Sequence, residues 1–137
     1  MPRVLYLRLR KRLTGPLLDK LPHRRKDGVS VLTAFDLNDT AGSPRARHYL
    51  PLFEATAAPD PDTGDWKTWE MLLASREMAP GQSDANAAIH VETDWGFGTV
   101  SSSLNALPGD AAGEDAKPHW RFATAWPARE AYRVVLP

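Results

Sequence analysis

The chain of 137 residues contains no cysteine. This absence excludes a disulfide framework and any metal site built on thiolates. The histidines are too widely separated to form a recognisable metal-binding motif, so the sequence predicts no bound metal and no cofactor. These histidines are His23, His48, His90 and His119.

Long hydrophobic runs are also missing. No apolar run approaches the roughly 20 residues that a membrane-spanning helix needs, so we expect no membrane span. Cations at residues 8–12 interrupt what would be the apolar region of a secretory signal. The sequence therefore predicts a cytoplasmic protein.

Charge is unevenly distributed, although the formal net charge is zero. Residues 1–26 hold nine Lys and Arg side chains against one acidic residue, whereas residues 27–137 hold eight against sixteen. A basic arm of this kind is typical of modules that bind nucleic acid or another anionic surface, and a basic-arm binding module is one alternative function. Only Tyr6 is interleaved with the cations, whereas base stacking uses several aromatic rings. We therefore do not expect nucleic acid as a partner.

Apolar periodicity predicts an α+β domain in which helices pack on one face of a largely antiparallel sheet. Residues 1–27 are expected to form a basic amino-terminal strand and loop, and residues 28–137 an α+β region of the same single domain. Strands are expected at residues 3–9, 29–35, 88–92, 99–107, around 120–124 and at 132–136. In the strand around 120–124, Trp120, Phe122 and Thr124 share one face.

Two helices are expected between the early and late strands. Ser43 can cap the first, with Pro44 in its first turn. Its apolar face is formed by Ala46, Tyr49, Leu50 and Phe53. Pro51 lies inside this pattern and is expected to kink or divide the helix. Asp65 is the expected cap of a second helix over residues 66–76, whose buried stripe is Trp66, Trp69, Leu72 and Leu73.

Three motifs suggest chemistry. Gly96-Phe97-Gly98 lacks the third glycine of a nucleotide-binding loop and predicts a tight turn. A run of serines suggests a small hydrolase, although small hydroxyl residues in a strand also serve packing. The candidate nucleophiles are Ser101, Ser102 and Ser103, with His90 or His119 as base and Asp94 or Asp36 as its orienting group. Pro2 suggests a tautomerase, because removal of Met1 would expose a secondary amine that can act as a base.

Several long segments, in order, resemble one known family. They read VSVLTAFDLND, SPRARHYLPLFEA, DWKTWEMLLASRE, GFGTVSSSLNALP and WRFATAWPAREAYRVVLP, and they extend from about residue 28 to residue 137. Together they resemble the carboxy-terminal half of the NRDE proteins, which are named for an Asn-Arg-Asp-Glu motif and are also called transport and Golgi organisation protein 2-like. Many members have an arginine in the central strand where this chain has Val100.

The resemblance implies an architecture and a partner. NRDE proteins resemble amino-terminal-nucleophile hydrolases with an αββα sandwich, a cysteine after the initiator methionine and the NRDE motif soon after it. This chain has neither that cysteine nor that motif. The resemblance therefore implies a part that is not catalytic by itself and whose partner is a separately encoded amino-terminal half or a second copy. Eukaryotic members are linked to secretory-pathway organisation, lipid homeostasis and haem handling, and the tryptophan-containing helix resembles that of bacterial members.

Overall fold

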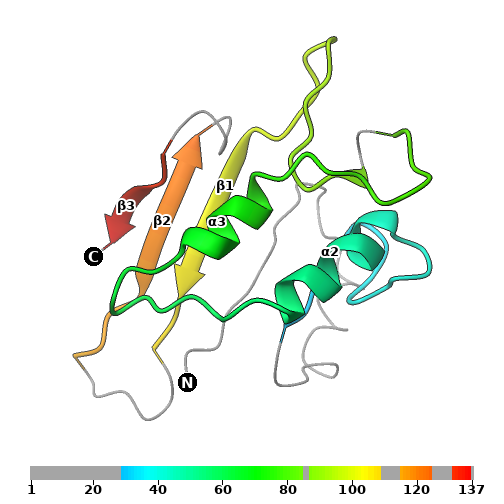
Figure 1. Cartoon of the computed structure of the whole chain (residues 1–137). Helices are drawn as coiled ribbons and strands as arrows, with labels where there is room; N and C mark the ends of the chain where they lie inside the picture. Colours follow the sequence, from blue (N-terminus) through cyan, green and yellow to red (C-terminus); the bar gives the residue numbers. More distant parts are fainter. Residues whose placement is uncertain (1–28, 85–86, 109–114, 125–130, 137) are drawn as a thin grey trace.

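The chain folds into two helices and a three-stranded antiparallel sheet, in a computed structural model that describes residues 29–84, 87–108, 115–124 and 131–136 (Figure 1). In chain order the elements are α2 (Pro44–Glu54), α3 (Lys67–Leu73), β1 (Ser101–Ala106), β2 (His119–Thr124) and β3 (Arg133–Leu136). The predicted α+β class is confirmed. The strand expected at residues 3–9 and the rest of the basic segment 1–27 lie outside the described residues.

Helix α2 begins where its capping sequence predicts. The buried Ser43 side chain accepts a hydrogen bond from the Ala46 backbone N–H (3.1 Å) and so satisfies one orphan amide of the first turn. Ala46, Tyr49 and Phe53 are buried along one side of the helix, as expected. The helix continues through Pro51 and is not divided there. Proline has no backbone N–H, so the carbonyl four residues earlier in the helix receives no hydrogen bond from it. Because this side of the helix is exposed at Pro51, that carbonyl can accept a hydrogen bond from water instead.

Helix α3 is shorter than expected and has a different cap. It starts at Lys67, with Trp66 rather than Asp65 in the capping position. Asp65 lies one residue before the capping position, where its side chain accepts a hydrogen bond from the Lys67 N–H (3.4 Å) and its backbone exchanges two with that of Asp60 at 2.9 and 3.0 Å. The expected apolar stripe is confirmed, since Trp66, Trp69 and Leu73 are buried and Leu72 is half-buried.

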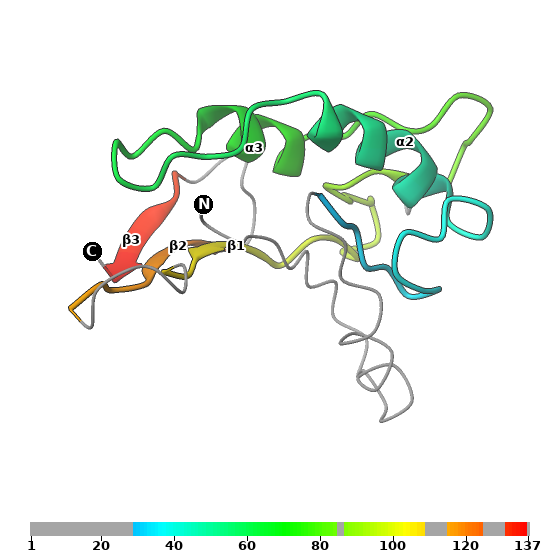
Figure 2. The ribbon, with the colours of Figure 1, turned by 90° about the horizontal axis from the view of Figure 1, so that it is seen from below.

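The sheet has the strand order β1-β2-β3, and both described helices lie on the same side of it (Figure 2). Leu104 and Ala106 of β1 and Ala123 of β2 are buried on the helix side. In the antiparallel register Ser103 pairs with Phe122 and Asn105 with Trp120. Trp120 and Phe122 therefore share a face, as predicted, and it is the face that points away from the helices.

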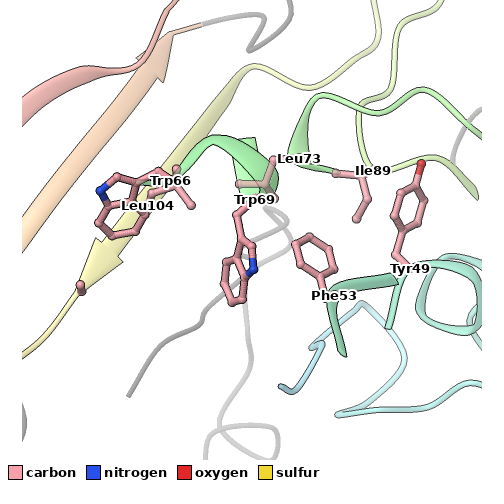
Figure 3. Packing of buried hydrophobic residues seen from close by; sticks show 8 residues of the cluster. Tyr49, Phe53, Trp66, Trp69, Leu73, Ile89 and Leu104 are labelled. Carbon is pink, nitrogen blue, oxygen red and sulfur yellow. The ribbon is translucent and has the colours of Figure 1, made fainter. Parts of the chain in front are cut away.

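An aromatic core joins the helices to the sheet (Figure 3). The rings of Phe53 in α2 and Trp69 in α3 meet edge to face with their centroids 5.3 Å apart, a favoured arrangement for aromatic pairs. The buried cluster consists of Tyr49, Phe53, Trp66, Trp69, Leu73, Ile89, Leu104 and Ala106. This cluster fixes which face of β1 becomes the inner face of the sheet.

The strand expected at residues 29–35 is replaced by a local reversal of the chain. The Val31 N–H donates to the Asn38 side-chain oxygen (2.7 Å), and the Asn38 N–H donates back to the Val31 carbonyl (2.7 Å). Asn38 adopts a left-handed conformation with φ 53°, which asparagine tolerates better than most residues. Val31 and Thr33 are buried, but Phe35 is 59% exposed. The predicted burial of this segment is therefore confirmed for Val31 and Thr33, but the predicted strand is wrong.

The strand expected at residues 88–92 is also wrong, although the segment is buried. The His90 N–H donates to the Ser75 carbonyl (2.9 Å), and the Val91 N–H donates to the Thr99 hydroxyl (2.9 Å). These bonds reach two different neighbours, so the segment forms no continuous ladder with one strand. The predicted turn that follows is confirmed, with Gly96 at φ 83°. A Cβ on Gly98 would lie 2.7 Å from the Val91 carbonyl oxygen, so glycine is required there.

Replacement of Tyr49 by Phe should destabilise the fold. The Tyr49 hydroxyl lies 2.5 Å from the Glu77 carbonyl oxygen and 3.0 Å from the Ser75 hydroxyl, and it thereby ties α2 to the segment after α3. We expect Tyr49→Phe to lower the free energy of unfolding by about 1–2 kcal/mol, because the Ser75 and Glu77 acceptors lose a donor whose own residue is fully buried. Urea denaturation measures this, with Thr63→Val at an exposed loop as the control. Equal effects of the two variants would contradict the assignment.

Candidate functional site

The serine run of β1 is divided between the two faces of the sheet. Successive side chains of a strand point to opposite faces, so Ser102 lies on the inner face and Ser103 on the outer face. Ser101 is exposed at the start of the strand, and the other two are half-buried. The three hydroxyls therefore do not converge on one site.

The inner hydroxyl is engaged by a tyrosine. The Ser102 and Tyr132 oxygens are 2.5 Å apart, and the Tyr132 ring packs against the aromatic core. Burial raises the pKa of Tyr132, an effect that the hydrogen bond from Ser102 partly opposes. A phenol with a raised pKa stays protonated at neutral pH, so Tyr132 is not a base that could activate Ser102. This contact instead ties β1 to the residue that precedes β3.

An ion pair lies beside this contact and joins the sheet to α3. Arg121 Nη1 of β2 is 2.9 Å from Glu70 Oε1 of α3, and both side chains are about a quarter exposed. The charges of Glu70 and Arg121 act in opposite directions on the pKa of Tyr132, with Glu70 raising it and Arg121 lowering it. The polar groups on the inner face thus hold the two layers of the domain together.

The outer sheet face is ordered by hydrogen bonds of its own. Trp120 Nε1 donates to the Ser103 hydroxyl (2.8 Å), and the Asn105 amide donates to the same oxygen (3.0 Å). The Trp120 and Phe122 rings meet edge to face at 6.5 Å. We use the term outer sheet face for Ser101, Ser103, Asn105, Trp120, Phe122 and Thr124, together with Arg133 of β3, which pairs with Phe122. Neither described helix covers this face (Figure 2).

His119, one proposed base, lies at the other end of the sheet from the first serines. It pairs with Ala106, whereas Ser102 pairs with Ala123 four residues further along β2. At the usual rise per residue this separation is roughly 13 Å. His119 Nε2 instead lies 3.8 Å from an oxygen of Asp62 in the loop before α3.

His90, the other proposed base, is buried with 2% of its surface exposed. Burial lowers its pKa, and the nearby Arg76 charge lowers it further, whereas Glu92 raises it. Arg76 and Glu92 form an ion pair of 2.8 Å. In the part of the chain that the structure describes, the hydroxyls of Ser101–Ser103 bond to no histidine. The serine-nucleophile hypothesis therefore stays a prediction.

The remaining predicted residues are dispersed. Asp36 Oδ1 accepts from the Leu37 N–H (2.8 Å) in the reversal after residue 33, and Asp94 is exposed at the turn before β1. Val100, where the resemblance would place an arginine, is 66% exposed. Pro2 lies outside the described residues, so the tautomerase hypothesis stays a prediction. Among the described residues, no three His, Asp or Glu side chains gather closely enough to hold a metal ion.

Sequence reasoning missed an exposed aromatic hairpin, residues 91–100. Trp95 is 80% exposed and Phe97 56% exposed at its turn. A shallow hollow is lined by Val91, Glu92, Thr93, Gly96, Phe97, Gly98, Thr99 and Val100. The available signal was Asp94-Trp95-Gly96, in which a tryptophan stands between two turn-forming residues and is therefore placed in an exposed turn.

Comparisons with known proteins identify no relative of this chain. No protein-family model, no curated protein and no solved structure matches this chain. The helices in the described ranges are too short or too polar to cross a bilayer. Functional interpretation therefore depends on the geometry and on the sequence resemblance.

Ionisation of Tyr132 should make the stability of the fold fall with rising pH in the alkaline range. Because its pKa is raised above the ordinary value of 10.0 in the folded state, the unfolded chain loses this proton first. The stabilisation is complete below about pH 10 and is lost as pH rises through the folded-state pKa. Urea denaturation between about pH 8 and 11 should show a smaller decline in Tyr132→Phe than in the wild type. Parallel declines would contradict this account.

Protonation of His90 should make the stability of the fold fall as pH drops into the mildly acidic range. Its folded-state pKa lies below the ordinary value of 6.5, so the unfolded chain takes up a proton more readily. Stability is highest above pH 6.5 and falls as pH drops toward the folded-state pKa. The decline should be reduced in His90→Gln and retained in His119→Gln, measured by denaturation across this range. Retention of the full decline in His90→Gln would show that another group is responsible.

Proposed function

We propose that this chain is a non-catalytic carboxy-terminal part of an NRDE-type protein. In this proposal the outer sheet face packs against a second sheet, as in an αββα sandwich. The observation that carries it is the one-sided packing of the sheet in the described residues, because α2 and α3 lie on the inner side and Trp120 is 37% exposed on the other.

The composition of the outer sheet face suits a second layer. Ser101, Ser103 and Thr124 have short side chains, which allow another sheet to approach to the usual distance of about 10 Å. Trp120 and Phe122 provide the large apolar surface that dominates such contacts. The hydrogen bond from Trp120 to Ser103 fixes the indole before any partner binds, which lowers the entropy cost of association.

The non-catalytic part of the proposal rests on the chemistry of β1. The family nucleophile is a cysteine, and the chain has none. Ser102 is hydrogen-bonded to a phenol of raised pKa, and Ser103 accepts from Trp120 and Asn105. These contacts give the hydroxyls structural roles on the two faces, and the chain contributes one layer of an assembly.

Association should therefore depend on the outer sheet face. Light scattering during size-exclusion chromatography would give the mass of the full chain alone, over a range of concentrations, and together with any polypeptide encoded upstream that begins Met-Cys and carries an NRDE motif. We expect an assembly with a second copy or with that polypeptide. Trp120→Ser should weaken it about tenfold or more because it removes a large apolar anchor, and Thr124→Arg should do so because it places a bulky charge on the same face.

Met71→Arg provides the matched control. Met71 lies on α3 and is 64% exposed, so its replacement adds a charge away from the outer sheet face. Circular dichroism would verify that each variant is folded. A chain that stays monomeric at all concentrations and binds no such upstream polypeptide would contradict the proposal, as would equal weakening by Met71→Arg.

A further inference from the structure

The hairpin of residues 91–100 is held together by its own hydrogen bonds and extends away from the sheet and the helices (yellow-green in Figure 1). The Thr99 N–H donates to the Val91 carbonyl (2.8 Å) at its base, and the Thr93 N–H donates to the Phe97 carbonyl (3.1 Å) near its turn. The Thr93 hydroxyl donates to the same carbonyl (2.6 Å). The backbone of the turn is therefore ordered before any partner arrives.

Its tip exposes apolar surface that the fold does not use. Trp95 is 80% exposed and Phe97 56% exposed, whereas Trp66 and Trp69 of the core are at most 3% exposed. Leaving large aromatic side chains in water forgoes the stabilisation of burial, which is roughly 1.5–3 kcal/mol for a large apolar side chain. Exposed tryptophans on rigid supports are the commonest anchors of protein interfaces.

The charge around this tip indicates the chemistry of the partner. Residues 91–100 contain two acidic residues, Glu92 and Asp94, and no Lys or Arg. Glu92 pairs with Arg76 outside the hairpin (2.8 Å), whereas Asp94 is exposed beside Trp95 in the turn. The negative charge at the turn disfavours an anionic partner such as nucleic acid or an acidic membrane. A neutral apolar partner would bury the Asp94 carboxylate without a compensating charge.

We infer that the hairpin tip binds an arginine-bearing segment of another protein. A guanidinium can stack on the Trp95 ring by a cation–π contact and pair with the Asp94 carboxylate beside it. Its planar form suits both contacts better than a lysine ammonium does. This interface is separate from the outer sheet face and does not depend on the proposed assembly.

Fluorescence anisotropy with short labelled peptides tests the inference on the full chain. The probes are a peptide of alternating arginine and serine, the same peptide with lysine, and the same peptide with neutral citrulline. We expect the arginine peptide to bind more tightly than the lysine peptide, and the citrulline peptide not to bind. Trp95→Ala should weaken the arginine complex about tenfold. Asp94→Asn should weaken it about twofold to fivefold and reduce its salt dependence.

Matched variants make the result specific to the hairpin. Phe35→Ala removes an aromatic ring that is 59% exposed in another loop, and Glu54→Gln removes an exposed carboxylate at the end of α2. Both should bind the arginine peptide as the wild type does. Absence of binding, equal binding of the citrulline peptide, or equal weakening by Phe35→Ala or Glu54→Gln would overturn the inference. Binding to neutral zwitterionic vesicles in place of the arginine peptide would also overturn it.

Discussion

The packing of two helices onto one face of β1 is the constraint on which the other features depend. Phe53 and Trp69 meet edge to face, and Leu104 of β1 is fully buried in the same cluster. Since side chains alternate along a strand, burial of Leu104 on the helix side also places Ser102 there and turns Ser103 away. One hydrophobic contact therefore decides which serine faces the core and which one faces away from it.

Polar contacts then stiffen the arrangement that the core selects. The Arg121–Glu70 pair and the Ser102–Tyr132 contact both cross between elements that the aromatic cluster has already brought together. Hydrogen bonds to half-buried groups contribute only about 1 kcal/mol each, but a missing partner costs more. Their main effect is thus to disfavour alternative registers of the sheet, in which Arg121 or Tyr132 would lose its partner.

Features determined locally were predictable from the sequence, and features determined by distant contacts were not. The start of α2 follows from Ser43 and Pro44, and its buried face follows from helical spacing. The strand expected at residues 29–35 failed because Asn38, outside that segment, supplies the side-chain oxygen that reverses the chain. Alternation correctly grouped Trp120 with Phe122, but it does not say which face is covered. The small Ala123 takes the buried side.

Two exposed aromatic surfaces of different character remain after the core is formed. On the outer sheet face the aromatic rings lie among short hydroxyl side chains and beside Arg133, which pairs with Phe122. At the hairpin, Trp95 stands beside Asp94, so an approaching neutral layer would have to desolvate a carboxylate. The two proposals therefore assign different partners to the two tryptophans, a second sheet to Trp120 and a cation to Trp95.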